Sequence, residues 1–357
     1  MDKKINATVA TAPLSTGVGR YAFLLHNLHF SDKLVFYKKS KSTDASGYEE
    51  VVTPSFSGYA LNALLSFVYP TKWGEDIQNY NWAHITTPDY FHLVKYNKNL
   101  VGTVHDLFTM ESKITAAAYS YAYRRFIQLN FKYVSKLKGV VAISENSKSS
   151  LEKKYPNVNV SVVRNWEEDV FRPRNKESIR LRLNLPKDKH LLLNVGSTEP
   201  RKNLKLLVRL MKSLPDNYIL LRIGSLGTYL QNISNKKIIQ LSQINDQDYA
   251  LYFNAADVYL APSFAEGFNR PLIQALKSNL PIIASDIDIH KEILQDSSYL
   301  LSPLDSVSWI EITKLICEQG LDPSSYQKIH ALSKYYSIQR ASEEMSNFYK
   351  TVLSSIQ

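Results

Sequence analysis

The chain alternates short apolar runs with longer stretches that carry helical spacing, and this pattern continues along its whole length. The runs have the length of β-strands, and the stretches between them have the apolar periodicity of α-helices. Strands that alternate with helices predict parallel sheets with helices on both faces, so the expected fold class is α/β. The expected strands are NATVATA (6–12), KLVFY (33–37), WAHIT (82–86), LVGTVHD (100–106), GVVAIS (139–144), VSVV (160–163), HLLLNVGS (190–197), NYILLRIGS (217–225), DVYLAPS (257–263), LPIIASD (280–286) and SYLLSP (298–303).

A polar segment, 167–189, separates two sets of expected strands. It contains Pro173, Pro186 and many charges, and we interpret it as a linker with one short helix. The 357 residues are enough for two domains of ordinary size. We therefore expect one domain over 1–172 and a second over 173–335.

Composition narrows the compartment and the partners. The single Cys317 excludes an internal disulfide framework, and the first residues lack the apolar core of a signal peptide. No stretch is apolar enough to span a membrane, so we expect the cytoplasm or the cytoplasmic face of a membrane. The formal net charge of +10 favours an anionic partner, such as nucleotide phosphates, lipid phosphate, an anionic membrane or nucleic acid. A solvated basic surface explains the same charge.

The stretch 258–285, VYLAPSFAEGFNRPLIQALKSNLPIIAS, has the order strand, loop, helix, strand. In such βαβ units, anions bind where the strand ends and the helix begins, because free backbone amides point there. Glu266 lies in that loop, which we expect to be exposed. A carboxylate disfavours an anion, so it is better suited to sugar hydroxyls or a developing oxocarbenium ion. The alternative is an ordinary buried βαβ unit with an acid in its loop.

The stretch NVGSTEPRKN (194–203) places two adjacent cations at another junction between strand and helix. The strand ends at Gly196, and Arg201 and Lys202 follow before the next helix. Arginine can bind a diphosphate in a bidentate manner, and lysine can bind it as a point charge. The sequence therefore indicates a diphosphate site here, or else a basic helix cap without a ligand.

The first half contains a glycine motif, TGVGRYA (16–22). Gly17, Gly19 and Ala22 fit the dinucleotide fingerprint G-x-G-x-x-A. An NAD site also needs an acid at the end of the second strand, whereas that strand here ends in the basic VFYKKSK. An NAD oxidoreductase is therefore disfavoured, and the motif is either a ligand loop or the plain start of a helix.

His105 and Asp106 directly follow the expected strand at 100–106. A lone histidine is usually structural, but the carboxyl end of a strand in an open α/β sheet is where ligand-binding residues are exposed. We expect His105 to donate or accept a hydrogen bond with a ligand, and Asp106 to orient the loop or the imidazole.

Together these stretches resemble the large family of retaining nucleotide-sugar glycosyltransferases called glycosyltransferase group 1, which have the GT-B fold. The family pattern PS-x-x-EGFGLP-x-x-EA and the PRKN segment are both present, whereas Asn269-Arg270 replaces Gly-Leu, Gln274 replaces the second Glu, and Trp166 replaces a Gly in the segment before the linker. The residues that match in 258–285 are Pro262, Ser263, Glu266, Gly267, Phe268, Pro271, Ala275, Pro281, Ile283, Ala284 and Ser285.

The resemblance implies two Rossmann-like domains that face each other across a cleft, with a C-terminal helix, about 336–357, that crosses back to the first domain. It implies retaining transfer of a hexose to a hydroxyl, with Arg201 and Lys202 stabilising the leaving diphosphate, Glu266 and His105 contacting the sugar, and Gln274 contacting the ribose. The expected catalytic residues are His105, Glu266, Arg201 and Lys202; the expected donor-binding residues also include Gly17, Gly19, Gly196, Phe268, Asn269, Arg270 and Gln274; Asp106 and Arg20 are expected to contact the acceptor or orient a loop.

The same resemblance sets the expected partners. We expect a UDP- or GDP-sugar as co-substrate, a glycan or lipid-linked acceptor, no tightly bound cofactor and no required metal, although Asp286-Ile287-Asp288 has the form of a metal triplet. The aromatic and basic run 114–139 is either a core-packed helix or a surface that faces an anionic membrane or the acceptor. Nucleic acid is not an expected partner. The alternatives are a glycosyltransferase that acts on nucleic acid or protein, and a sugar-nucleotide-binding protein without catalysis.

Overall fold

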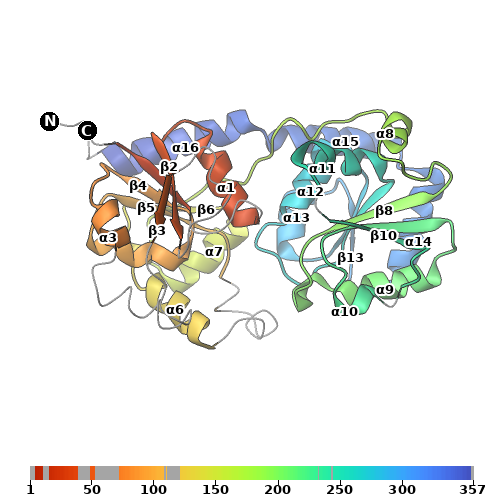
Figure 1. Ribbon diagram of the computed structural model, residues 1–357, viewed down its shortest axis with the longest axis horizontal. Coiled ribbons are helices and arrows are strands. Elements are labelled where there is room, and N and C mark those ends of the chain that lie inside the picture. Colours follow the sequence, from red (N-terminus) through yellow and green to blue (C-terminus); the bar gives the residue numbers. More distant parts are fainter. Residues whose placement is uncertain are drawn as a thin grey trace. The chain divides into compact units, whose positions relative to one another are not determined.

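The computed structural model describes residues 5–10, 16–38, 49–52, 72–107, 110, 121–231, 233–242 and 244–354. Its contacts divide the chain into unit 1, Met1–Asn165 with Ala341–Gln357, and unit 2, Trp166–Arg340 (Figure 1). We expected the divisions at 172 and 335. The first lies earlier because the side chains of Trp166 and Glu167 are already buried within unit 2.

Unit 1 is built on a seven-stranded sheet in the order β3-β2-β1-β4-β5-β6-β7, in which every neighbouring pair is parallel. Its strands are β1 Ala7–Ala10, β2 Lys33–Lys38, β3 Glu49–Val52, β4 Ala83–Ile85, β5 Leu100–Val104, β6 Gly139–Ala142 and β7 Val160–Val162. Its helices are α1 Gly17–His26, α3 Lys72–Ile77, η1 Pro88–Lys95, α6 Tyr121–Phe131, η2 Val134–Lys136, α7 Glu145–Lys154 and most of α16 Ile338–Leu353.

The C-terminal helix α16 packs on the sheet of unit 1. The backbone of Gly139 in β6 comes so close to this helix that an added Cβ would lie 2.6 Å from Val352 Cγ1. Tyr349 of the same helix is hydrogen-bonded at 2.6 Å to His84 of β4. The last helix therefore completes a core that the first half of the sequence begins.

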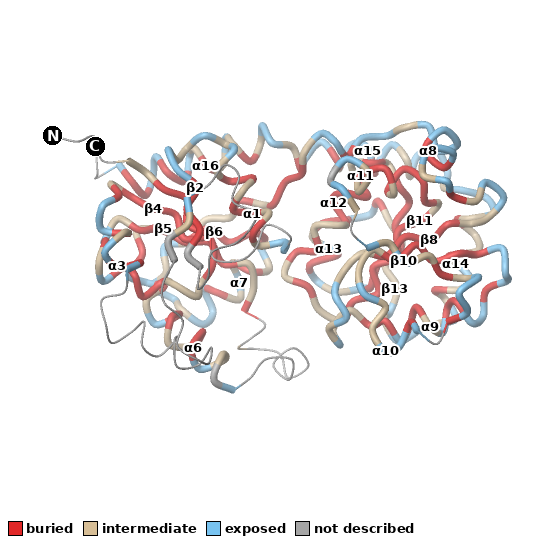
Figure 2. Tube along the Cα trace, viewed as in Figure 1, coloured by how far each residue is buried: buried red, intermediate tan, exposed pale blue. Residues whose placement is uncertain are grey.

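Unit 2 has a six-stranded parallel sheet in the order β10-β9-β8-β11-β12-β13. Its strands are β8 His190–Val195, β9 Tyr218–Ile223, β10 Ile238–Leu241, β11 Val258–Ala261, β12 Ile282–Ser285 and β13 Tyr299–Leu301. Its helices are α8 Lys176–Arg182, η3 Pro200–Lys202, α9 Leu204–Ser213, α10 Gly227–Leu230, α11 Asp246–Ala255, α12 Arg270–Lys277, α13 Asp288–Leu294, α14 Ser306–Gln319 and α15 Pro323–Tyr335. Figure 2 shows the central strands of each sheet buried beneath helices whose outer faces are exposed.

The α/β class is confirmed, and each expected strand has a counterpart in the structure. In unit 2, β8 lies between β9 and β11, and the sheet continues to one side through β9 and to the other through β11. Where the strand order changes direction in this way, a crevice opens at the carboxyl ends of the neighbouring strands β8 and β11, and ligands of open α/β sheets bind in such crevices. The loops after β8 and β11 are therefore where a ligand site is expected in unit 2.

Candidate functional site

The acid and the two cations that the sequence singles out in unit 2 meet at the carboxyl ends of β8 and β11. Glu266 follows β11 and accepts hydrogen bonds from Arg201 Nη1, from Lys202 Nζ at 2.6 Å and from Ser263 Oγ at 2.6 Å. Arg201 and Lys202 lie in η3, the short turn between β8 and α9. Two segments that are far apart in sequence thus form one charged cluster.

Glu266 is buried, with only 6% of its surface exposed, so the expectation of an exposed loop was wrong. Burial alone would raise the pKa of its carboxyl, but Lys202 and Arg201 outweigh burial and lower the pKa to about 2. The side chain is therefore ionised at neutral pH. Two cations and a hydroxyl provide the compensation that a buried carboxylate requires.

Backbone and side-chain hydrogen bonds fix the position of this cluster. Phe264 N donates to Arg201 O at 2.7 Å, which ties the loop after β11 to η3. Asn203, in the left-handed conformation with φ 51°, donates through Nδ2 to the carbonyl oxygens of Pro262 at 3.1 Å and Pro303 at 2.9 Å. The two loops are therefore held in register by contacts that do not involve the charges themselves.

A second acid shares Arg201. Glu199 Oε2 accepts a hydrogen bond from Arg201 Nε at 2.6 Å. Burial would lower the pKa of Arg201, but Glu266 and Glu199 outweigh it and raise that pKa. Two cations and two acids make this group formally neutral, so any anion that binds here competes with Glu266 and Glu199 for the same donors.

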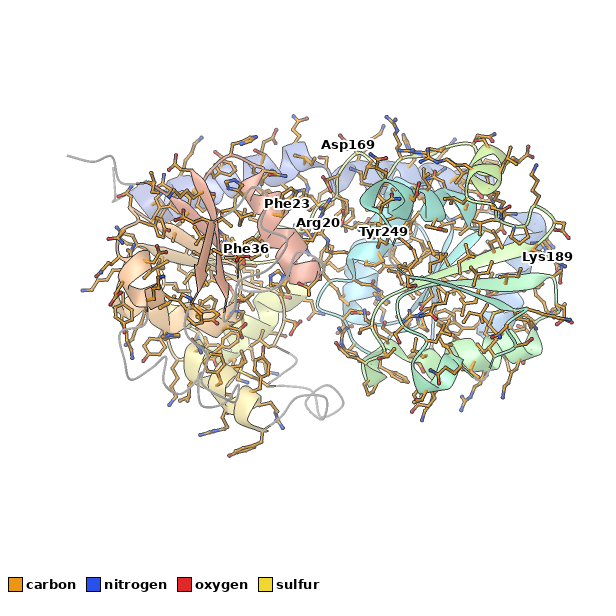
Figure 3. All side chains as sticks on the ribbon, in the orientation of Figure 1. Arg20, Phe23, Phe36, Asp169, Lys189 and Tyr249 are labelled. Carbon is orange, nitrogen blue, oxygen red and sulfur yellow. The ribbon has the colours of Figure 1, made fainter. Side chains whose placement is uncertain are left out.

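A second cluster surrounds Gln274 of α12. Gln274 Oε1 accepts from the hydroxyl of Tyr249 at 2.8 Å, and its Nε2 donates to Glu167 Oε1 at 3.2 Å. Arg270, the first residue of α12, pairs with the same Glu167 oxygen at 2.5 Å and donates to Trp166 O at 3.3 Å. Figure 3 labels Tyr249, which comes from the neighbouring helix α11.

This second cluster gathers three of the four positions at which the chain departs from the family pattern. Trp166, Arg270 and Gln274 are such departures, and each is hydrogen-bonded within the cluster. Glu167 joins them, and burial raises the pKa of its carboxyl while Arg270 opposes that shift. Glu167 is not among the site residues predicted from the sequence, in which its place directly after Trp166 is the only signal.

Phe268 and Asn269 shape the loop that leads into α12. Phe268 is buried and packs edge-on against Tyr336, with 6.2 Å between ring centroids. Asn269 has φ 72°, in the left-handed region that asparagine tolerates better than most residues, which explains why it can stand where the family has glycine. Its Nδ2 donates to His290 Nε2 at 3.0 Å, and His290 Nδ1 in turn donates to Ser285 O.

In unit 1, His105 follows β5 and is held from several sides. Its Nε2 lies 3.0 Å from Thr86 O, and a carbonyl only accepts, so Nε2 carries a proton. The His105 carbonyl accepts from Ser147 Oγ at 3.0 Å, and Ser147 belongs to the capped first turn of α7. Tyr21 meets the imidazole edge-on, with 4.9 Å between ring centroids. Asp106 follows at a half-buried position.

The glycine motif forms the start of α1. Thr16 is the N-cap and its Oγ1 accepts from Gly19 N at 3.0 Å, so the amide of the second glycine already has a partner. Gly17 is exposed and Gly19 is buried. Arg20 lies over the ring of Phe23, with 5.2 Å from its Cζ to the centroid, and Figure 3 shows both on α1. The motif thus forms the capped start of α1.

The remaining expectations concern metal and membrane. Asp286 pairs with Lys291 at 2.8 Å, and Asp288 is the first residue of α13. Across the described residues, no group of three His, Cys, Asp or Glu side chains could hold a metal ion, and no helix is long and apolar enough to cross a membrane. In the run 114–139, Phe126, Ile127 and Phe131 of α6 are buried in the core of unit 1, whereas residues 114–120 lie outside the described part.

Sequence comparisons match the second unit to a family. Residues 175–329 match the family described as "Glycosyl transferases group 1". The chain is 27% identical over 248 residues to the O-antigen chain mannosyltransferase RfbU of Salmonella typhimurium, spanning 63% of this chain and 67% of that protein. It is 26% identical over 175 residues to the O-antigen chain mannosyltransferase B of Escherichia coli, spanning 44% of this chain and 45% of that protein.

Solved structures match the fold over nearly the whole chain. Anabaena HepE in complex with UDP and glucose has a TM-score of 0.77 at 13% identity, covering 97% of this chain and 99% of that one. WaaG, a glycosyltransferase involved in lipopolysaccharide biosynthesis, has a TM-score of 0.76 at 14% identity, covering 96% and 99%. At these identities the likeness concerns the fold, and it confirms the GT-B architecture.

Proposed function

We propose that the protein is a glycosyltransferase that transfers a hexose from a nucleotide sugar to a hydroxyl of a glycan, with retention at the anomeric carbon. The match of residues 175–329 to the glycosyl transferases group 1 and the GT-B fold of the chain support this proposal. Unit 2 would bind the donor, and unit 1 would bind the acceptor.

The cluster of Glu266 with Arg201 and Lys202 carries this proposal. It lies at the carboxyl ends of β8 and β11, where the strand order of the parallel sheet changes direction. It combines two phosphate-binding cations with a buried, ionised acid. The cations suit the diphosphate of a nucleotide sugar, on which negative charge grows as the bond to the sugar breaks. The carboxylate suits the sugar itself, whose hydroxyls donate to it and whose anomeric carbon becomes cationic.

The donor and acceptor are proposed more broadly. HepE was crystallised with UDP-glucose, which supports a uridine nucleotide, and the names of the relatives support mannose as the hexose. We therefore propose a UDP- or GDP-hexose as donor and a membrane or lipid-linked glycan as acceptor. The formal charge of +10 suits a peripheral position on an anionic membrane. With two fixed cations beside the acid, donor binding should need no divalent metal.

The test is a thermal-shift screen against UDP-, GDP-, ADP- and dTDP-sugars in EDTA, followed by measurement of nucleotide release. A ligand that binds the native state raises its melting temperature. We expect one nucleotide class to stabilise the protein and to release nucleotide without added metal, and Lys202→Ala to lose the release. Stabilisation by no nucleotide sugar, or release that requires Mn²⁺, would refute the corresponding part of the proposal.

One observation favours a second candidate, a sugar-nucleotide-binding protein without catalysis. Gln274 stands where the family has its second acid, and its amide is occupied by Tyr249 and Glu167. This candidate predicts donor binding without transfer or hydrolysis of any donor. The nucleotide-release measurement separates the two, because a binding protein would stabilise with the nucleotide sugar and release nothing.

A further inference from the structure

A buried arginine lies beneath the loop that follows β8, and the sequence motifs do not include it. Arg222 in β9 is 1% exposed. Its guanidinium donates to Asn194 Oδ1, to Gly196 O at 2.7 Å, to Ser197 O at 2.9 Å and to Ser225 O at 3.2 Å. All of these partners are neutral oxygens, and no acidic side chain of the described residues forms an ion pair with it.

Burying a cation without a carboxylate partner costs free energy of desolvation, so the position of Arg222 favours a functional role. Burial lowers the pKa of Arg222 to about 10, which still leaves it charged at neutral pH. Arg180, also in unit 2, is buried and donates to carbonyl groups as well, but unlike Arg222 it forms an ion pair with Asp257 at 2.7 Å. The positive charge of Arg222 remains uncancelled directly under the loop.

The hydrogen bonds of Arg222 determine which way the loop amides point. In a trans peptide the C=O and the N–H of one unit point in opposite directions, and no cis peptide occurs among the described residues. Because the carbonyls of Gly196 and Ser197 both turn toward Arg222, the amides of Ser197 and Thr198 turn away from it. Both residues are exposed, and within the described residues neither amide donates a hydrogen bond.

The same loop adjoins the charged cluster. A Cβ added at Gly196 would lie 3.5 Å from Lys202 Cε and 3.7 Å from its Nζ, so the lysine side chain extends along this glycine. A Cβ at Gly224 would collide with Gly196 O, so the loops after β8 and β9 meet through glycines that leave room for the guanidinium bonds. Two consecutive outward amides next to an ammonium form an anion-binding arrangement.

We propose that Arg222 is a positioning residue for the donor phosphates: it turns two carbonyls inward, so that the amides of Ser197 and Thr198 face a phosphate group beside Lys202. This inference rests on the proposed function, because the phosphate is assigned to a nucleotide sugar. It adds a backbone subsite to the two side-chain cations, and it gives a buried, chain-interior arginine a role in recognition.

The experiment uses inorganic pyrophosphate and UDP or GDP as probes in EDTA, with the protein labelled with ¹⁵N at serine and threonine. In the wild type, pyrophosphate should shift the amide resonances of Ser197 and Thr198. Arg222→Met should remove these shifts and weaken both probes by about tenfold, equivalent to about 1.4 kcal/mol. Arg180→Met is the matched control, since it removes another buried arginine of the same unit and should leave probe affinity unchanged.

If Arg222→Met does not fold, Arg222→Lys carries the test. Lysine keeps the charge but lacks the planar fork that holds several carbonyls, so it should fold, show reduced amide shifts and lose affinity several-fold. Nucleotide binding equal to wild type in both variants overturns the phosphate subsite and leaves the proposed function intact. Pyrophosphate shifts at both amides without binding of any nucleotide sugar support the subsite and refute the proposed function.

Discussion

The substitution Glu266→Gln should tighten nucleoside diphosphate binding while abolishing transfer. The Glu266 carboxylate pairs with donors on both Arg201 and Lys202, and glutamine keeps its shape while removing its charge. A diphosphate would then meet two cations that are no longer neutralised by this acid. Catalysis should still fail, because the group proposed to contact the sugar has lost its charge.

The size of the gain follows from the geometry. Glu266 Oε1 lies 2.6 Å from Lys202 Nζ, so a phosphate oxygen bound to another proton of that ammonium would lie about 5 Å from the carboxylate. Two like charges at that distance repel by about 0.8 kcal/mol in water and about 3 kcal/mol at an effective dielectric constant of 20. A value between these, about 1.4 kcal/mol, corresponds to about tenfold tighter binding.

In the absence of nucleotide, Glu266→Gln should lower the stability of the protein. Arg201 and Lys202 lose a partner, and their side chains are only 18% and 16% exposed. We expect a loss of about 2 kcal/mol, below the cost of breaking a fully buried pair because water reaches both cations. For a protein of this size that lowers the melting temperature by a few degrees, so the variant should start lower and gain more from UDP or GDP.

The assay combines scanning fluorimetry with calorimetric titration of UDP and GDP in EDTA. Glu199→Gln is the control, since Glu199 pairs with Arg201 alone and its side chain is 34% exposed. It should change affinity much less than Glu266→Gln does. Weaker or unchanged nucleotide binding by Glu266→Gln would refute the competition between this acid and the donor phosphates.

Three further outcomes follow. Arg201→Ala or Lys202→Ala should each lower transfer by roughly 10²-fold, and unchanged nucleotide release in both would place the diphosphate elsewhere. Burial lowers the pKa of His84 to about 3, so the neutral side chain stabilises the fold fully above about pH 6.5, and this stabilisation is lost as the pH falls toward 3. Between pH 7 and pH 5, the free energy of unfolding in urea should therefore fall less in His84→Gln than in the wild type. An equal fall in both proteins would contradict His84 as its source. Gln274→Glu should lower the melting temperature, because it places a second carboxylate against Glu167. The double variant Glu167→Gln/Gln274→Glu should recover most of the lost melting temperature. If the two substitutions instead lower the melting temperature additively, this double-mutant cycle contradicts the pairing of residues 167 and 274.

The sequence predicted the alternating architecture well because most interior strands are mainly apolar and stand out as short apolar runs between polar stretches. The two strands it missed, β3 and β10, both lie at sheet edges. The residues of β3, EEVV, are half charged, and those of β10, IIQL, follow a polar turn, so neither stands out from its surroundings. An edge strand needs less apolar surface, and that weakens the only signal available.

For the candidate site, the sequence identified Glu266, Arg201 and Lys202 but not their mutual contact. Spacing along the chain places each at a strand end, and only the order of strands in the sheet shows that β8 and β11 are neighbours. Arg222 could not be found in this way, since a charged residue inside the apolar run YILLRI looks like an exposed position on a strand. Its burial depends on carbonyl groups from two loops, which carry no residue-specific signal.

Three of the four departures from the family pattern, Trp166, Arg270 and Gln274, are linked by hydrogen bonds around Glu167, and this bears on the missing acid at position 274. Arg270 would be an uncompensated, partly buried cation at the start of α12 without Glu167, and Glu167 would be an uncompensated buried acid without Arg270. Gln274 then donates to that same acid, which a glutamate could not do. The carboxylate absent at 274 is thus present a hydrogen bond away at 167. A substitution set that keeps a buried carboxyl group beside α12 favours a site that still operates over one that has decayed.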